Sequence, residues 1–362
     1  MRVLHTGDIH LNGGFDTDAA ESLNKIAEIC TREEIDYIHI NGDIFDSKST
    51  PEQRLVFKNF LNMWPPSFII RGNHDQPEDL KIYISQTTIV AEQPKWVSFG
   101  DNYNVLAIPH FNAGALAQEV DTQEELGEKG SNAFDDLINS LINQAYTMEG
   151  IKVLTFHGTV GGAMLDNGYI PRHNGIHLRS GVLETFPGLV IGGHYHKYQD
   201  VLGNGSIFYS GSPTRHTFGE EGEKGVIIVD YDKDNVAHPH FVEIKGRPMF
   251  VLGCEFKNGE VIWDDPEKAE AAKEGGDVKI KCRVDKDDIV AMKSSKFMDD
   301  YANADVLKFD PEIRINTTIR CEEIKGADSI PAAVKLWLEQ TGYEDGEITR
   351  LLEQLETLLK VC

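Results

Sequence analysis

The chain has 362 residues, with 59 acidic against 35 basic side chains and a formal net charge of −24. This length allows two or three domains with a sizeable core, and the composition is that of an ordinary globular protein. So acidic a protein is not expected to coat nucleic acid over its whole surface. It can still be a nuclease, because bound divalent cations reverse the local charge at a site.

The cysteines and the apolar runs indicate the compartment. The five cysteines are scattered, without a C-x-x-C pair, which favours free thiols in a reducing environment over a disulfide or zinc framework. The N-terminal segment has no apolar stretch typical of a secretory signal, and no apolar run is long enough to span a bilayer. We therefore expect a cytoplasmic protein without membrane contact.

The first part of the chain alternates strands and helices. Apolar runs predict strands over residues 2–6, 36–40 and 68–70. A helix is expected over 17–35, capped by Asp16 or Thr17, and another over 51–64, opened by Pro51. This order is typical of the βαβ units of a mostly parallel sheet.

Further strands and one helix complete a large α/β domain. The strands are predicted over 97–99, 105–108, 152–156, 189–191, 206–209 and 225–231. A helix is expected over 134–146, whereas the acidic segment 115–130 reads as irregular. Beyond residue 245 the pattern changes to a small α/β domain with an alternating strand over 278–284.

Two helices are predicted at the C-terminal end, the first opened by Pro331 after a cap at Asp328 or Ser329. An apolar stripe runs through both of them: Val334, Trp337, Leu338, Ile348, Leu351, Leu352, Leu355, Leu358 and Leu359. Two short helices cannot bury this whole stripe against each other. It either packs on the small domain or receives a helix of another chain.

Polar residues follow five of the predicted strands of the large domain. They are Asp8 and His10, then Asp43, then Asn73 and His74, then His157, and finally His194 and His196. Each one alone has an ordinary explanation, such as a turn or a hydrogen-bonded surface histidine. Repeated at the carboxyl ends of strands in one sheet layer, they are expected to converge at one rim.

This mixture of ligands predicts a centre of two divalent metal ions. Carboxylate, imidazole and amide groups suit Mn²⁺, Fe²⁺ or Zn²⁺, and the oxygen share favours Mn²⁺. So many candidates suit two ions about 3.5–4 Å apart, bridged by a carboxylate. Such a pair activates a water and neutralises charge that develops on a phosphoryl group.

These motifs resemble those of a known superfamily, the calcineurin-like metallophosphoesterases. The matching segments are Asp8-x-His10, Gly42-Asp43-x-x-Asp46, Gly72-Asn73-His74-Asp75, His157-Gly158 and Gly193-His194-x-His196. The segment from Gly211 to Glu220, followed by Lys224-Gly225-Val226-Ile227, is similar to the SbcD-type nucleases, bacterial and phage relatives of the meiotic-recombination-eleven nuclease. The resemblance covers roughly residues 1–245.

The resemblance implies an α/β fold, a double β-sheet sandwich flanked by helices. It divides the chain into a nuclease domain over 1–245, a small DNA-binding capping domain over 246–326 and a helical segment over 327–362. This segment would bind an SbcC-like coiled-coil ATPase. A homodimer is implied as well, in the cytoplasm of a cell or of a phage host.

The resemblance also implies a role for each site residue. One metal ion would be held by Asp8, His10 and His196, and the other by Asn73, His157 and His194, with Asp43 bridging the two. His74 would bind no metal and would assist proton transfer to the leaving oxygen, a task for which an imidazole is suited near neutral pH. Mg²⁺ and Fe²⁺ are the alternatives to Mn²⁺.

One position departs from this family, and a basic loop adds two substrate candidates. Cellular nucleases of the family often carry histidine where Asp46 stands. At neutral pH Asp46 cannot donate a proton as a histidine can, so a substrate contact by Asp46 is expected to lack this proton donation. Arg172 and Arg179, in a loop without acidic residues, are candidates for DNA phosphate contacts or are merely exposed.

Three functions are compatible with this reading of the sequence. The first is a Mn²⁺-dependent DNA exonuclease and endonuclease that processes DNA ends in recombination and repair. The second is a stand-alone phosphodiesterase or phosphatase acting on a small substrate. The third is a catalytically idle scaffold, which the complete ligand set disfavours. Phosphoprotein phosphatases typically continue Gly-Asp-x-x-Asp with Arg-Gly and read Gly-Asn-His-Glu, whereas this chain has Ser47-Lys48 and Asp75.

Overall fold

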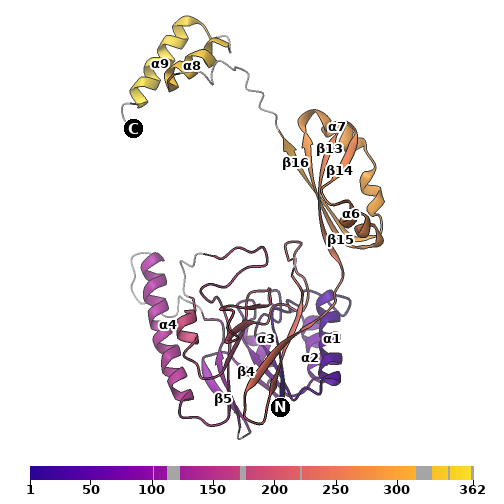
Figure 1. Ribbon diagram of the computed structural model, residues 1–362, viewed down its shortest axis with the longest axis vertical. Coiled ribbons are helices and arrows are strands. Elements are labelled where there is room, and N and C mark those ends of the chain that lie inside the picture. Colours follow the sequence, from indigo (N-terminus) through magenta and orange to yellow (C-terminus); the bar gives the residue numbers. More distant parts are fainter. Residues whose placement is uncertain are drawn as a thin grey trace. The chain divides into compact units, whose positions relative to one another are not determined.

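The computed structural model describes residues 1–100, 102–111, 123–171, 177–220, 222–314, 328–340 and 343–359 (Figure 1). The chain forms two compact units, Met1–Val251 and Leu252–Cys362. The larger unit has the α/β architecture expected from the sequence, with two mixed sheets and helices on their outer faces. None of the described helices combines the length and the apolar character needed to cross a membrane.

The first sheet carries the N-terminal βαβ units. Its strand order is β12 (Ala237–Glu243), β11 (Gly225–Tyr231), β1 (Arg2–Thr6), β2 (Tyr37–Ile40), β3 (Ser67–Ile70) and β4 (Thr88–Ala91). Strands β1 to β4 are parallel, and β11 and β12 extend the sheet in antiparallel pairs. Helices α1 (Asp18–Arg32) and α2 (Pro51–Leu61) cover its outer face, and α3 (Pro77–Lys81) follows β3.

The second sheet runs in the order β5 (Lys95–Phe99), β6 (Tyr103–Ile108), β7 (Ile151–His157), β8 (Leu189–Gly193), β10 (Ile207–Tyr209) and β9 (Gln199–Asp200). Helices α4 (Gln123–Ala145) and α5 (Ser180–Leu183) belong to this half. Helix α4 begins earlier than expected, so the prediction of irregular chain is wrong for residues 123–130. The rest of that segment lies outside the described residues.

Local signals explain where the helices start. The hydroxyl of Thr17, rather than Asp16, accepts the Ala20 amide at 3.2 Å and caps α1. Thr50 and Gln53 form a reciprocal capping box in front of Pro51 at the start of α2. Helix α1 ends at Arg32, before Glu34 takes a left-handed φ of 51°.

The two sheets of the larger unit enclose a core that contains two buried histidines. In β1 and β2, alternate side chains face this inter-sheet core, among them His5 and His39, whose ring centroids are 4.6 Å apart. His39 Nε2 lies 3.0 Å from the hydroxyl of Tyr103 in the second sheet. Burial lowers the pKa of His5 well below its usual value and that of His39 to about 3.

The second unit contains a small sheet with the order β14 (Glu260–Trp263), β13 (Met249–Lys257), β15 (Gly276–Asp285) and β16 (Ala304–Arg314). It also contains α6 (Pro266–Ala271) and α7 (Ile289–Ser294). The strand predicted over 278–284 lies within β15, where buried residues alternate with more exposed ones. The predicted boundaries at 245 and 326 and the capping role of this unit stay predictions.

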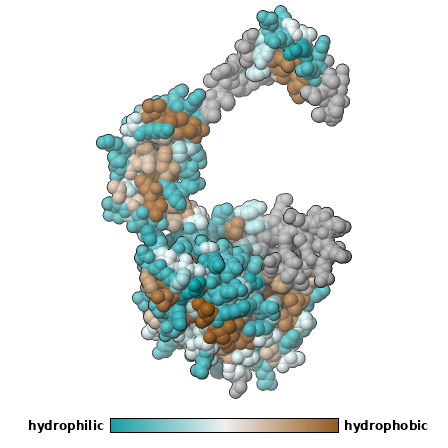
Figure 2. Space-filling view, turned by 180° about the vertical axis from the view of Figure 1, so that it is seen from behind, coloured by the Kyte–Doolittle hydropathy of each residue, from teal (hydrophilic) through white to brown (hydrophobic). Residues whose placement is uncertain are grey.

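The last two helices, α8 (Ile330–Gln340) and α9 (Asp345–Leu359), pack against each other. Ser329 caps α8, since its hydroxyl accepts the Ala332 amide at 3.3 Å. Leu338 and Ile348 are buried, while Trp337 is 51% exposed. Hydrophobic surface is accordingly visible on this helical pair (Figure 2).

The buried His39 predicts acid sensitivity of the fold. Its pKa of about 3 lies below the ordinary 6.5, so the unfolded chain binds more protons between these values. The stability that neutral His39 gives is complete above pH 6.5 and is lost as the pH falls. We expect His39→Leu to reduce the loss of unfolding free energy between pH 7 and pH 5 by about 2 kcal/mol, measured by urea denaturation.

The control for this experiment is His238→Gln, because the His238 side chain is 59% exposed. It should keep the wild-type pH dependence. If the loss of unfolding free energy between pH 7 and pH 5 were the same in His39→Leu as in the wild type, the buried ring would not be its cause.

Candidate metal centre

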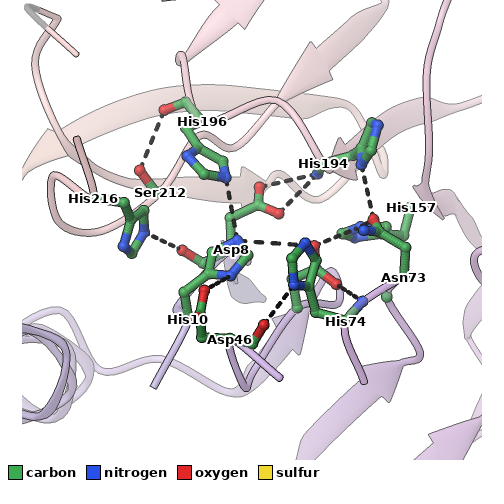
Figure 3. Close-up of polar contacts among 12 residues, drawn as sticks. Asp8, His10, Asp46, Asn73, His74, His157, His194, His196, Ser212 and His216 are labelled. Carbon is green, nitrogen blue, oxygen red and sulfur yellow. Dashed lines mark hydrogen bonds and ion pairs between the residues drawn. The ribbon is translucent and has the colours of Figure 1, made fainter. Parts of the chain in front are cut away.

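The strand-end residues of both sheets meet at one rim of the larger unit. Those of the first sheet follow β1, β2 and β3. In the second sheet, His157 is the last residue of β7, and His194 and His196 follow β8. Their side chains face one another across the site (Figure 3). The structure thus brings together Asp8, His10, Asp43, Asn73, His74, His157, His194 and His196.

One group consists of Asp8, His10 and His196, with one possible ligand atom from each lying within 4.8 Å of the others. His10 Nε2 and His196 Nε2 are 3.2 Å apart. The buried Asp8 carboxylate accepts the backbone N–H of His194, at 2.9 and 3.0 Å to its two oxygens. This bond joins the end of β8 to the end of β1.

A second group consists of Asp43, His157 and His194. Asp43 Oδ2 lies 3.2 Å from His157 Nε2 and 3.8 Å from His10 Nε2, so this carboxylate faces both groups. The Asn73 side-chain oxygen lies 3.0 Å from His157 Nε2 and 2.9 Å from His194 Nδ1. The second group therefore offers two ring nitrogens, a carboxylate and an amide oxygen.

The backbone at the site is held in unusual conformations. Asp8, His10, Asp43 and His194 have φ values of 51°, 48°, 52° and 106°, a region that residues with a side chain rarely occupy. Such strain persists only where the surrounding structure enforces it, and it concentrates at functional sites. Gly72 is required beside them, because a Cβ there would collide with the Asp43 carboxylate.

The geometry of His157 fits a bound cation. Its Nδ1 lies 2.6 Å from the carbonyl oxygen of Asn41 and donates to it. A neutral ring would then aim its Nε2 lone pair at the Asp43 carboxylate, which is favourable only with a cation or a second proton between them. Burial lowers the pKa of His157, but the Asp43 and Asp8 carboxylates outweigh it and raise the pKa to about 9.

The remaining electrostatics suit metal ligands as well. Burial lowers the pKa of His10 and of His194 to about 3, so both rings are neutral at pH 7 and offer a lone pair. Burial raises the pKa of Asp8 to about 6, although His157 and His196 act in the opposite direction. The donor set thus combines imidazoles with ionisable carboxylates, as Mn²⁺ and Fe²⁺ sites do.

His74 and Asp46 lie at the edge of this centre. His74 Nδ1 is 2.6 Å from the backbone oxygen of Asp46, and the His74 amide donates to Asp43 Oδ1 at 2.8 Å. The Asp46 carboxylate, 58% exposed, approaches His10 Nδ1 at 3.5 Å. The three side chains of His10, Asp46 and His74 form a further group with ligand atoms within 4.8 Å, so geometry alone leaves His74 two roles.

The two arginines proposed for DNA contact differ in what the structure describes. Arg172 lies outside the described residues. Arg179 forms an ion pair with Asp135 at 2.9 Å and donates to the Asn132 side chain at 2.8 Å. Its guanidinium therefore ties the segment before α5 to helix α4.

Sequence reasoning did not assign a role to Asp75, which connects two of the site loops. This buried carboxylate accepts the amides of Ile44, Phe45 and Gly72 at 2.9, 3.2 and 3.0 Å. His216 was also missed, and its Nε2 lies 2.9 Å from the carbonyl oxygen of Asp8. Asp75 and His216 both lie within motifs quoted from the sequence, and this position is the signal by which they could have been found.

A pocket next to His157 and His194 was not foreseen either. Its lining includes His110, Phe111 and Phe134. The His110 ring centroid is 6.3 Å from that of His157. His110 follows β6 by two residues, as Asp8 follows β1, but it belongs to none of the motifs quoted from the sequence.

Comparisons with known proteins found a matching family and several similar proteins. The model of the calcineurin-like phosphoesterase family matches residues 1–198. The chain is similar to a subunit of nuclease SbcCD from Bacillus subtilis (strain 168), with 26% identity over 265 residues, 64% of this chain and 66% of that protein. The match thus spans 66% of the length of this curated relative.

Similar solved structures include TT1561 of Thermus thermophilus, with a TM-score of 0.36 and 13% identity over 66% of this chain and 98% of that chain. Another is a dimetal phosphatase from Danio rerio, with a TM-score of 0.40 and 10% identity over 63% of this chain and 92% of that chain.

Substitution of Asp43 tests the metal centre directly. Asp43→Asn removes the negative charge that faces both groups, so we expect calorimetric titration with Mn²⁺ to show two bound ions in the wild type and at most one in the variant. Asp234→Asn, in the turn between β11 and β12, is the control and should bind as the wild type does. Two ions of undiminished affinity in Asp43→Asn would exclude a bridging role.

Proposed function

Because the chain belongs to the calcineurin-like phosphoesterase family, we propose that this metal-dependent phosphoesterase is a Mn²⁺-dependent DNA exonuclease and endonuclease. It would be the nuclease subunit of an SbcCD-like complex for DNA end processing, recombination and repair. The assignment as a hydrolase is supported above all by one observation: side chains able to bind metal converge from five strand ends at one rim of the larger unit. DNA as the substrate is supported by the similarity to the SbcCD nuclease of Bacillus subtilis.

In this proposal, the residues of the two groups hold two divalent ions, most simply Mn²⁺, with Mg²⁺ and Fe²⁺ as alternatives. Such ions supply an activated water and neutralise charge on the phosphoryl group. Asp8, His10 and His196 bind one ion, and Asn73, His157 and His194 bind the other. Asp43 bridges them, consistent with its distances of 3.2 and 3.8 Å to His157 and His10.

His74 is proposed as the general acid for the leaving oxygen. Its Nδ1 donates to the Asp46 carbonyl at 2.6 Å, which holds the ring and leaves Nε2 for proton transfer. Asp46 itself lies at the solvent side of the site, where it can contact substrate through its exposed carboxylate. A carboxylate repels a phosphate, so this contact would be made through a cation or a sugar hydroxyl.

Contact with DNA would be local in so acidic a protein. We propose Arg172 and Arg179 as phosphate contacts, with Arg179 exchanging Asp135 for a phosphate on binding. We further propose that the capping domain over residues 246–326 contributes to DNA binding and that the protein acts as a homodimer in the cytoplasm. These assignments rest on the resemblance to SbcD-type nucleases.

The rival function is hydrolysis of a small phosphodiester or phosphomonoester. Linear duplex DNA, bis-p-nitrophenyl phosphate and a phosphomonoester, each assayed with Mn²⁺, distinguish the two. We expect cleavage of DNA and of the diester, with little activity on the monoester. Turnover of the monoester alone, with intact DNA, would overturn the nuclease proposal.

The same assays test the role of His74. We expect His74→Ala to lose roughly 10²–10⁴ in cleavage rate, the usual contribution of general acid catalysis, while binding Mn²⁺ with wild-type stoichiometry in calorimetry. Loss of a bound ion along with activity would instead assign His74 to the metal ligands.

Deletion of residues 328–362 tests the proposed ATPase contact. Helices α8 and α9 leave Trp337 51% exposed, as expected for a pair that binds a further helix. The truncated protein should keep Mn²⁺-dependent nuclease activity but should no longer co-elute with an SbcC-like ATPase in size-exclusion chromatography. Undiminished co-elution would show that the apolar stripe only supports the fold.

A further inference from the structure

A buried cluster of charged side chains lies behind one of the histidines of the metal centre. Lys224 is only 3% exposed and Glu220 only 6%. The ammonium of Lys224 contacts Glu220 Oε2 at 2.7 Å and Asp166 Oδ1 at 3.3 Å, and it donates to the backbone oxygen of His196 at 2.9 Å. Buried charges of this kind are retained only where they are paired and hydrogen-bonded.

The second oxygen of Glu220 points to the His196 ring. Glu220 Oε1 lies 3.2 Å from His196 Nδ1. The chain around Glu220 holds this carboxylate in place, because the Thr217 hydroxyl and the His216 amide each donate to it at 3.3 Å. The carboxylate is therefore held between a lysine on one side and an imidazole on the other.

This arrangement determines which ring nitrogen of His196 carries the proton. An ionised carboxylate only accepts hydrogen bonds, so His196 Nδ1 must donate. In the neutral ring the lone pair is then on Nε2, the atom that lies 3.2 Å from His10 Nε2 in the group with Asp8. Carboxylate partners commonly orient metal-binding histidines in this way.

We propose that Glu220 is a positioning residue that fixes His196 with its proton on Nδ1 and its Nε2 toward the metal ion, and that Lys224 holds Glu220 in this orientation. This inference rests on the proposed two-metal function. It assigns a role to Glu220 and Lys224, which lie outside the proposed set of ligands.

The substitution Glu220→Gln is sharper than removal of the side chain. The amide oxygen is expected to face the Lys224 ammonium, which leaves the amide NH₂ facing His196 Nδ1. The ring must then accept at Nδ1 and carry its proton on Nε2, the wrong form for a metal ligand. Shape is conserved while the tautomer is reversed.

Two measurements on the full-length protein test the proposal. In calorimetric titration with Mn²⁺, we expect Glu220→Gln to weaken one of the two binding events about 10–100-fold and to leave the other unchanged. In the metal-free protein labelled with ¹⁵N-histidine, at a pH that keeps the His196 ring neutral, its signals should shift from the Nδ1–H to the Nε2–H form.

Asp166→Asn is the matched control, because Asp166 contacts the same lysine but not His196. It should bind both ions as the wild type does. If Asp166→Asn weakened Mn²⁺ binding as much as Glu220→Gln does, the cluster would only support the local structure, and the proposal would be overturned. So would two wild-type binding events, or an unchanged tautomer, in Glu220→Gln.

A double variant guards against failure of Glu220→Gln to fold. Glu220→Leu with Lys224→Met replaces the buried pair by apolar side chains, an exchange that folds commonly tolerate. It should show the same selective weakening of one binding event, and two binding events of wild-type affinity would overturn the proposal. If the wild type itself bound no Mn²⁺, the proposed two-metal function would be wrong, whatever the effect of the Glu220 variants.

Discussion

The structure of the larger unit depends on placing the Asp43 carboxylate, almost fully buried, against the His157 ring. Oδ2 lies 3.2 Å from His157 Nε2, and Oδ1 accepts the His74 amide at 2.8 Å. This pair joins the end of β2 in one sheet to the end of β7 in the other. It also concentrates negative potential where a cation is to bind, so the same contact serves the fold and the chemistry.

Other polar contacts between the sheets keep this pair in register. The Thr155 hydroxyl donates to the Asn41 side-chain oxygen at 2.6 Å, and the Asn41 amide reaches Ser210 at 3.4 Å. The apolar inter-sheet core lies below these contacts. The polar contacts and the apolar core together hold the backbone of four strand-end residues of the centre at positive φ.

The proposed action on DNA poses an electrostatic problem for a protein with a net charge of −24, because that substrate is a polyanion. Arg179 is paired with Asp135, and Lys224 is buried with Glu220, so neither offers an unpaired positive charge to a phosphate. Attraction would therefore come from bound cations at the rim. Activity and substrate binding then depend together on metal, which makes both sensitive to loss of the ions.

The sequence by itself determined the order of strands and helices, the start of α2 at Pro51 and the residue types at the strand ends, because these follow from local periodicity and turn chemistry. Only the tertiary structure decided which ring nitrogens face inward, that Asp75 ties two loops together, and that Glu220 lies behind His196. Those contacts join segments distant in the chain, and their geometry depends on how two sheets pack, which no local pattern encodes.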